Sequence, residues 1–436
     1  MLPQKQENFR RLAITGGRPA FDEKLHVGRP NLGDKERLLR RVSDVLESGW
    51  LTNNGPYLVE FEQRIAALTG ARHCIAVCNA TIGLEIAIRA LEMSGEVIVP
   101  SFTFAATAHA LQWQGITPVF CDVDPVTHSL DPRDVERCIT SRTTGIIGVH
   151  LWGNACDTNA LEKIAQRRGL KLLFDAAHAF GCSHDGQMIG NFGQAEVFSF
   201  HATKFCNSFE GGAITTNDDE LADRFRVLRN FGMLQDGVAH EVGTNGKMSE
   251  ISAAMGITSL ESLNEFVAIN RANYLAYKKH LDGTPGLKLF QHNEGGRNNF
   301  QYVIVEVDDA VAGVSRDELQ KILQAENVMA KSYFSPGCHR LNAYRRRGGH
   351  LNRRLPVTER LADRTLALPT GAAIGEKDIR IIGEIIATAI GRAGRVVQER
   401  TPQTRGKQAE EYDRIGARWG GELIWGALQV GLLAGM

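Results

Sequence analysis

Between residues 95 and 216 the chain alternates short apolar runs with stretches of helical spacing. The runs that we expect to form strands cover residues 96–100, 118–124, 145–150, 171–175, 196–200 and 213–216. The stretches that we expect to form helices lie near residues 103–114, 131–139 and 157–168. Apolar strands that alternate with helices belong to mostly parallel sheets covered on both faces. The sequence therefore predicts an α/β fold, in which ligands bind at the carboxyl ends of the strands.

A second region begins after a predicted long helix, which runs from Ser249 to about Asp282 because its apolar residues recur at helical spacing. The elements expected beyond it are a strand at 299–307, a helix at 315–326, a strand at 329–334 and a helix from 376 to about 393. This change of pattern predicts three parts, namely a large domain over 1–265, a smaller C-terminal α/β domain over 266–395 and an accessory tail of unknown role over 396–436.

The composition excludes several classes of protein. Hydrophobic residues make up 43% and charged residues 23% of the chain, which is ordinary usage for a globular protein. Lys plus Arg equals Asp plus Glu at 50 each, so we expect no nucleic-acid partner. No run reaches the roughly 18 apolar residues of a membrane span, and residues 1–13 lack the apolar core of a signal peptide. We therefore expect a cytoplasmic protein that does not enter a membrane.

The eight cysteines form no Cys-x-x-Cys pair. A structural zinc site draws four ligands from tightly spaced residues. We therefore expect no metal site, and we interpret the cysteines as free, mostly buried thiols of a reducing compartment.

One acid and one lysine carry the strongest chemical signal. The sequence has no phosphate-binding P-loop, no G-x-G-x-x-G, no G-x-S-x-G and no H-E-x-x-H. Asp175 closes the strand-like run KLLFD, and Lys204 follows just past the next predicted strand. A lysine near a strand-end carboxylate suggests imine chemistry with pyridoxal 5'-phosphate. A helix cap at Asp175 and a solvated charge at Lys204 are the alternative interpretation.

This chemistry would need both groups. A carboxylate beside the pyridine nitrogen keeps that nitrogen protonated, so that the ring accepts electrons from the substrate. The Lys204 amine would hold the cofactor and then move protons. A free lysine has a pKa of about 10.4, so the pocket must lower the pKa of Lys204 by burial or by a neighbouring cation.

A phosphate group would need a second subsite. Residues 79–83, NATIG, follow a short apolar run and precede the predicted helix 84–92. Thr81 and the surrounding amides suit a phosphate at a helix N-terminus, and a plain helix cap fits the same residues. Ser199 at its strand end offers another hydroxyl. Phe104 after a strand would stack on a cofactor ring or lie in the core.

The order of several blocks resembles that of the DegT/DnrJ/EryC1/StrS family, which comprises pyridoxal-phosphate-dependent nucleotide-sugar aminotransferases with the aspartate aminotransferase fold (fold type I). The resemblance spans about residue 26 to 392 and leaves the tail outside. The blocks are GWLTNNGPYLVEFE (49–62), CNATIGL (78–84), VIVPSFTFAAT (97–107), PVFCDVD (118–124), VHLWGNACD (149–157), FDAAHAFG (174–181), SFHATK (199–204), EGGAITTND (210–218) and GTNGKMSEISAAMG (243–256).

The resemblance implies roles around the cofactor ring. Lys204 would be the lysine that forms the imine with pyridoxal phosphate. Asp175 would pair with the pyridine nitrogen, and His178 would lie near the ring oxygen. Phe104 would stack on the ring, at a position where the family often has an aromatic residue.

The resemblance also implies a phosphate subsite and a dimer. Ala80, Thr81 and Ser199 would bind the phosphate of the same subunit. Asn245 would reach the phosphate of the neighbouring subunit's cofactor. Such a contact implies a homodimer with shared active sites.

The substrate class follows from the same resemblance. The block around His201 looks like that of members that aminate C4 of a dTDP-4-keto-6-deoxyhexose with L-glutamate as donor, in deoxyamino-sugar biosynthesis. Members that act on 3-keto sugars more often carry tyrosine at that position, and a 3-keto-sugar aminotransferase stays an alternative. His339 and the loop that contains Thr52 and Asn53 are substrate-binding candidates by position, and a surface loop is the alternative for each.

Two other readings stay open. The unusual tail suggests a non-catalytic sensor or partner homologue that keeps the fold. A pyridoxal enzyme of another reaction type, such as a dehydratase, is the second, although family dehydratases replace the lysine at position 204 with histidine.

Overall fold

A computed structural model describes residues 11–293, 295–345 and 353–391. The predicted tail 396–436 and the predicted helix end near residue 393 lie outside the described residues. The division of the chain at residues 265 and 266 stays a prediction. Within the described residues, no helix combines the length and the apolar character that crossing a membrane requires.

The described residues form a seven-stranded sheet in the order β2-β10-β9-β6-β5-β3-β4. Its strands are β2 (His73–Val77), β3 (Glu96–Pro100), β4 (Thr117–Cys121), β5 (Thr143–Val149), β6 (Lys171–Asp175), β9 (Ala195–Ser199) and β10 (Gly212–Thr216). The strands from β9 to β4 pair in parallel, whereas β10 is antiparallel to both of its neighbours. The mostly parallel sheet predicted from the alternating runs is confirmed.

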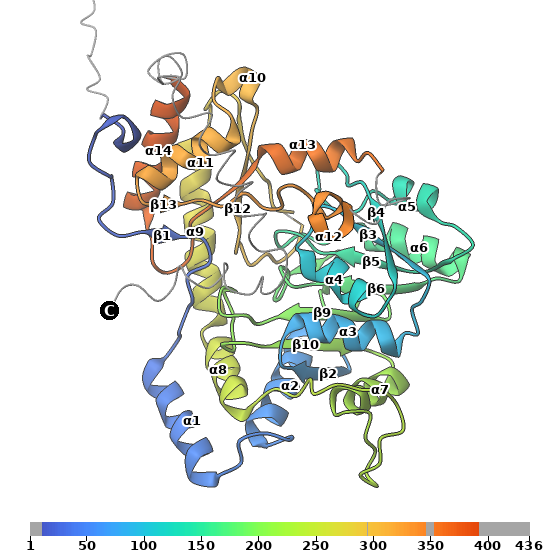
Figure 1. The fold of residues 1–436 in the computed structure, drawn as a ribbon. Coiled ribbons are helices and arrows are strands. Elements are labelled where there is room, and N and C mark those ends of the chain that lie inside the picture. The colour runs from blue at the N-terminus through green and yellow to red at the C-terminus, as the bar shows by residue number, and fades with distance from the viewer. Residues whose placement is uncertain (1–10, 294, 346–352, 392–436) are drawn as a thin grey trace, which may run out of the picture. The chain divides into compact units, whose positions relative to one another are not determined.

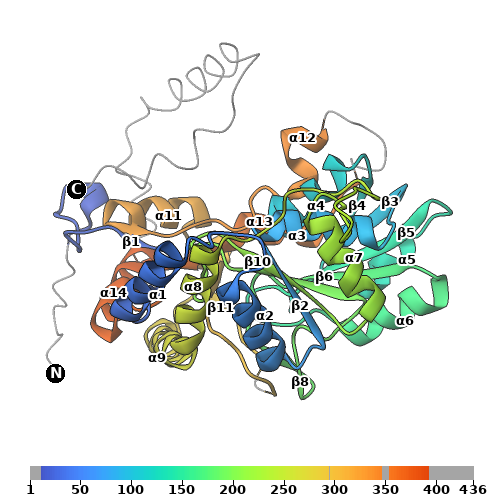
Figure 2. The ribbon, with the colours of Figure 1, turned by 90° about the horizontal axis from the view of Figure 1, so that it is seen from below.

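Helices cover both faces of this sheet (Figure 1 and Figure 2). One buried cluster joins the sheet to α2 (Pro56–Thr69), α5 (Pro132–Cys138), α6 (Thr158–Arg168) and α8 (Glu250–Glu261). The cluster on the other face joins it to α3 (Ala80–Ala90), α4 (Ala105–Trp113) and α7 (Asp219–Arg229). Because both faces are covered, the strands read as continuous apolar runs.

The single long helix predicted from Ser249 to Asp282 is wrong. The structure has two helices, α8 and α9 (Leu263–Leu281), with Ser262 between them. The Ser262 amide bonds to the carbonyl of Ser259, three residues back, at 3.2 Å. This bond ends the four-residue hydrogen-bond ladder on which a continuous α-helix depends.

The second region contains a three-stranded antiparallel sheet in the order β11-β12-β14. Its elements are β11 (Leu287–Leu289), β12 (Val303–Val307), α10 (Asp309–Ala312), α11 (Arg316–Ala325), β13 (Val328–Met329), α12 (Asn342–Arg345), α13 (Pro356–Arg364), β14 (Thr365–Leu368) and α14 (Glu376–Gly391). The remaining elements are η1 (Ala13–Thr15), β1 (Leu25–His26), α1 (Lys35–Ser48), β7 (Ser183–His184), β8 (Gln187–Met188) and η2 (Cys338–Arg340).

Two predicted strands are shorter than expected. The strand predicted at 299–307 begins only at Val303, and the strand predicted at 329–334 is limited to β13, which pairs in parallel with β1. One aromatic side chain from each missing part packs against the same buried ring. Tyr302 and Phe334 each contact the buried ring of Trp152, with ring centroids 5.2 Å away in both cases.

Candidate active site

The site lies at the carboxyl edge of the parallel strands. Asp175 is the last residue of β6 and Ser199 is the last residue of β9, which pairs with β6 in parallel. Phe104 follows β3 and precedes the first turn of α4. Lys204 lies in a turn after β9, where its amide donates to the carbonyl of His201 at 2.8 Å. Neighbouring parallel strands therefore place the predicted acid, hydroxyl and lysine on one edge.

The side chain of Lys204 is partly buried, and the pKa of its amine is lowered. Nζ donates to the hydroxyl oxygen of Tyr302 at 3.1 Å. Burial lowers the pKa of Lys204 to about 8, although the negative charge of Asp175 opposes this shift. About a fifth of such amines are neutral near pH 7.4, compared with about one in a thousand for a free lysine. The lowered pKa that imine chemistry requires is therefore present.

Asp175 is a buried carboxylate with its orientation fixed. Its Oδ2 accepts from the hydroxyl of Thr107 at 2.7 Å, and its Oδ1 accepts from the amide of Ala177 at 3.1 Å. Burial raises the pKa of the Asp175 carboxyl, whereas these two hydrogen bonds and the charge of Lys204 oppose the rise. A cationic partner at this carboxylate would offset its burial.

His178 has a ring held between aromatic side chains. It stacks on Trp152 at a centroid distance of 5.5 Å and lies 4.3 Å from the ring of Tyr302. Burial, reinforced by the charge of Lys204, holds the pKa of His178 well below its usual value, so the ring is neutral. Its Nδ1 is buried and, among the described residues, has no hydrogen-bond partner. Such an orphaned polar atom calls for a ligand.

Two of the predicted phosphate residues, Ala80 and Ser199, lie beside Gly212. Gly212 pairs with Ser199 in the sheet, and a Cβ atom added to Gly212 would lie 2.7 Å from the amide nitrogen of Ala80. The helix predicted at 84–92 begins earlier, at Ala80, because the side chain of Asn79 caps it by accepting from the amide of Ile82. The amides of the first turn have no intrahelical partner, which suits an anion.

Asn245 lies on an exposed loop near the same helix. The next residue, Gly246, accepts from the amide of Cys78 at 2.8 Å, and Asn245 forms an isolated bridge with Asn230. The loop is thus anchored beside β2, while the Asn245 side chain is exposed. Its predicted contact with a partner subunit stays a prediction.

The substrate candidates have different settings. The side chain of His201 is half exposed, and its Nδ1 contacts the hydroxyl of Thr203 at 2.8 Å. His339 is buried, with Nδ1 2.6 Å from the hydroxyl of Ser101. Thr52 and Asn53 lie on an exposed loop. Among the described residues, no hydrogen bond or ring contact connects His339, Thr52 or Asn53 to Lys204, Asp175 or His178, so their substrate roles stay predictions.

Phe104 exposes 59% of its surface although it borders the site. The sequence did not single out three further residues, namely Thr107, Trp152 and Tyr302. Thr107 lies one helical turn after Thr103, to which its hydroxyl also bonds at 3.0 Å. Tyr302 lies within the strand predicted at 299–307. In the structure it precedes β12, and its hydroxyl contacts Lys204.

This edge suits a transferase of the pyridoxal phosphate class, in which a lysine amine and a strand-end carboxylate act on one ring. The DegT/DnrJ/EryC1/StrS aminotransferase family model matches residues 33–387, and the chain belongs to this family. The predicted family, fold type and enzyme class, a pyridoxal-phosphate-dependent sugar aminotransferase, are confirmed.

Individual relatives are similar over most of their length. The dTDP-4-amino-4,6-dideoxy-D-glucose transaminase of Escherichia coli is 33% identical over 84% of this chain and 98% of its own. The spore coat polysaccharide biosynthesis protein SpsC of Bacillus subtilis (strain 168) is 34% identical over 82% and 95%. The crystal structure of DesI in the presence of its TDP-sugar product is 51% identical, with a TM-score of 0.85, over 89% of this chain and 98% of that one.

Proposed function

We propose that this aminotransferase moves an amino group from L-glutamate to C4 of a nucleotide-linked, dTDP-bearing 4-keto-6-deoxyhexose, in deoxyamino-sugar biosynthesis. The observation that carries the chemistry is Lys204, whose pKa is lowered to about 8 beside Asp175. The choice of sugar is supported by the transaminase of Escherichia coli and by the 51% identity with DesI.

The residues present fit pyridoxal phosphate. Asp175 would pair with the pyridine nitrogen, and the orphaned Nδ1 of His178 would gain a partner. Phe104 has an exposed ring with which a second ring can stack. The amides of Ala80 and Thr81 and the hydroxyl of Ser199 would donate hydrogen bonds to the phosphate. When bound, the cofactor would supply an electron sink for negative charge on the substrate carbon.

The chain's own residues perform the remaining work. Lys204 Nζ takes a proton from the carbon that loses nitrogen and returns one to the sugar carbon that gains it. Tyr302 holds Nζ through its hydroxyl at 3.1 Å, so the amine stays in reach of the ring position. Thr107 and Ala177 fix both oxygens of Asp175 in one orientation. Because glutamate and sugar use this site in turn, ping-pong kinetics are expected.

The test of this chemistry uses two lysine variants. We expect the purified protein to bind pyridoxal phosphate and to release stoichiometric 2-oxoglutarate from L-glutamate before any sugar is added. Lys204→Ala should abolish both the cofactor absorption band and this release. Lys171→Ala, which removes an exposed lysine at the opposite end of β6, is the matched control and should change neither. A wild-type protein that binds cofactor without turnover would establish the non-catalytic homologue instead.

A homodimer with shared active sites is also part of the proposal. Exposed apolar side chains gather on the loop between Phe231 and Val242, which precedes Asn245. Apolar groups of this kind are typical of protein interfaces. A cytoplasmic location is supported by the eight free thiols.

Mixing two inactive variants tests the shared site. Lys204→Ala and Asn245→Asp are each expected to be inactive, the second because it places a carboxylate against the phosphate. In a dimer that contains one subunit of each variant, one active site carries both substitutions and the other active site carries neither. Random mixing should therefore restore about a quarter of the wild-type activity. A mixture without activity would refute the contribution of Asn245 to the partner's site.

A further inference from the structure

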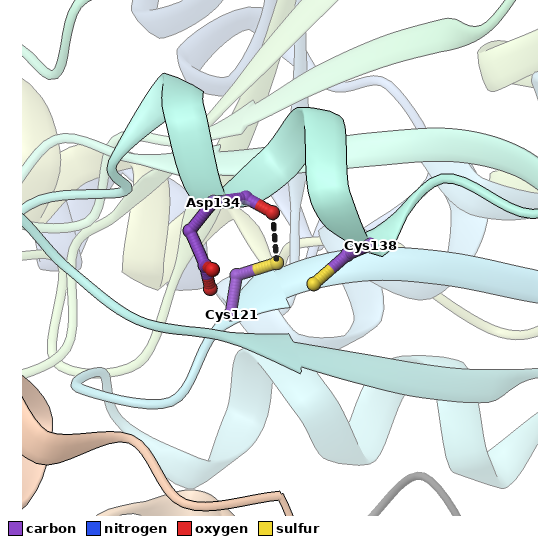
Figure 3. A group of neighbouring side chains, drawn as sticks. All are labelled: Cys121, Asp134 and Cys138. Carbon is purple, nitrogen blue, oxygen red and sulfur yellow. Dashed lines mark hydrogen bonds between the residues drawn. The ribbon is translucent and has the colours of Figure 1, made fainter.

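A cluster of two thiols and a carboxylate lies away from the site described above. Cys121 is the last residue of β4, whereas Asp134 and Cys138 belong to α5. The two sulfur atoms and a carboxylate oxygen of Asp134 lie within 4.8 Å of one another (Figure 3). All three residues are buried, and the thiol of Cys121 bonds to the backbone carbonyl of Asp134 at 3.8 Å. No Cys-x-x-Cys spacing marks this cluster in the sequence.

Arg353 supplies a cation to the cluster. Its Nη1 donates to the Cys138 sulfur at 2.6 Å and to Asp134 Oδ2 at 3.0 Å, and its Nη2 donates to Asp134 Oδ1 at 2.5 Å. The more distant Arg137 lies 3.8 Å from the same carboxylate. A guanidinium beside a sulfur atom stabilises the thiolate, which is the reactive form of cysteine.

The two thiols are therefore unequal. The neighbouring Cys121 thiol and the charge of Arg353 lower the pKa of Cys138, although burial and the Asp134 carboxylate oppose the shift. Burial raises the pKa of Cys121 well above its usual value. Cys138 is therefore the more readily ionised thiol of the pair.

The same guanidinium disfavours a metal ion. Zn²⁺ would lie about 2.3 Å from a thiolate sulfur and about 2.0 Å from a carboxylate oxygen. Arg353 already contacts the sulfur of Cys138 and both oxygens of Asp134 at 2.5 to 3.0 Å. A divalent cation on those atoms would lie against the guanidinium, and like charges repel at this distance.

We infer that Cys138 and Cys121 form a peroxide-sensitive modification site, in which Cys138 reacts first and Cys121 resolves the product as a disulfide. The Cys138 thiolate attacks one peroxide oxygen, so that a sulfur–oxygen bond forms, the oxygen–oxygen bond breaks and hydroxide leaves with a solvent proton as water. The Cys121 sulfur then attacks the Cys138 sulfur. A disulfide forms, the sulfur–oxygen bond breaks, and the leaving hydroxide takes the Cys121 proton. Two thiols are oxidised, and hydrogen peroxide is reduced to two waters.

The reaction requires only local movement. The sulfur atoms start within 4.8 Å and must approach to about 2.05 Å. The bond would tie the end of β4 to the end of α5, and Arg353 would lose the thiolate while keeping Asp134 as its partner.

The experiment treats the cofactor-loaded protein with hydrogen peroxide and maps its peptides by mass spectrometry after alkylation. We expect one cross-linked pair, Cys121 with Cys138, with the loss of two hydrogen atoms. Cys206, which is also buried and whose pKa is raised by burial, should stay reduced and is the internal control. Cys121→Ser should leave Cys138 as a sulfenic acid that dimedone traps. A Cys138 that stays reduced under peroxide would overturn the inference.

Arg353 variants test the role of the cation. Arg353→Gln should slow alkylation of Cys138 near pH 7 about tenfold, because a neutral side chain no longer stabilises the thiolate. Arg353→Lys keeps the charge and should retain most of the rate, and circular dichroism identifies a variant that fails to fold. Equal rates in folded wild type and Arg353→Gln would refute the proposed activation. Uptake of one equivalent of Zn²⁺ by the reduced protein, lost in Cys138→Ser, would make the cluster a metal site instead.

Discussion

Removing the hydroxyl of Tyr302 should lower the pKa of Lys204 further. Tyr302→Phe deletes the oxygen that accepts from Nζ at 3.1 Å and leaves the ring that packs on Trp152 and His178. A hydrogen bond to a charged group contributes about 1.5–3 kcal/mol. Because this bond stabilises the ammonium form, its loss should lower the pKa of Lys204 from about 8 by roughly one to two units.

The assay is competitive labelling of the cofactor-free protein with acetic anhydride across a pH series. The reagent reacts with the neutral amine, so the pH at half-maximal labelling of Lys204 reports its pKa. Tyr333→Phe is the matched control, because Tyr333 belongs to the same aromatic group and contacts Trp152 at 6.2 Å. We expect a lower midpoint in Tyr302→Phe and an unchanged one in Tyr333→Phe. An unchanged or higher midpoint in Tyr302→Phe would refute the argument.

Three further predictions concern the cofactor and the fold. Gly212→Ala should weaken cofactor binding in a fluorescence titration, because its Cβ would lie 2.7 Å from the amide of Ala80. Phe104→Ala should weaken cofactor binding by about 0.5–1.5 kcal/mol, or roughly two- to tenfold. Trp113→Ala, which removes the 83% exposed ring of the last residue of α4, should not change the affinity. The pKa of Glu261 is lowered to about 2, since the hydrogen bonds from Arg41 and Arg37 outweigh the effect of burial. A lowered carboxyl pKa stabilises the folded state above the unfolded pKa of about 4.3. Thermal denaturation should therefore show this stabilisation falling from about pH 4.3 to about pH 2, and Glu261→Gln should reduce the fall.

The sequence predicted the mostly parallel sheet, and the positions of Asp175 and Ser199 at its strand ends, because both depend on local patterns. Each apolar run contains its own strand, and parallel pairing then brings the ends of β6 and β9 together. Asp175 and Ser199 could thus be placed on one edge from strand ends alone.

Other features depend on contacts between distant segments. Tyr302 reaches Lys204 only because the chain turns before Val303, although an alternating pattern fits a strand from residue 299 onward. Ser262 interrupts a stretch whose apolar spacing is helical on both sides. The sulfur atoms of Cys121 and Cys138 come close together because α5 packs against β4. Hydrophobic periodicity reports local structure and does not predict contacts between distant segments.

Amination at C4 is tested most directly by following the nitrogen. The protein is incubated with isotopically labelled L-glutamate and dTDP-4-keto-6-deoxyglucose, and nuclear magnetic resonance then locates the label on the sugar. We predict labelled nitrogen at C4 with the wild-type protein and no labelled sugar with Lys204→Ala. Nitrogen at C3, or a labelled sugar formed without Lys204, would contradict the account.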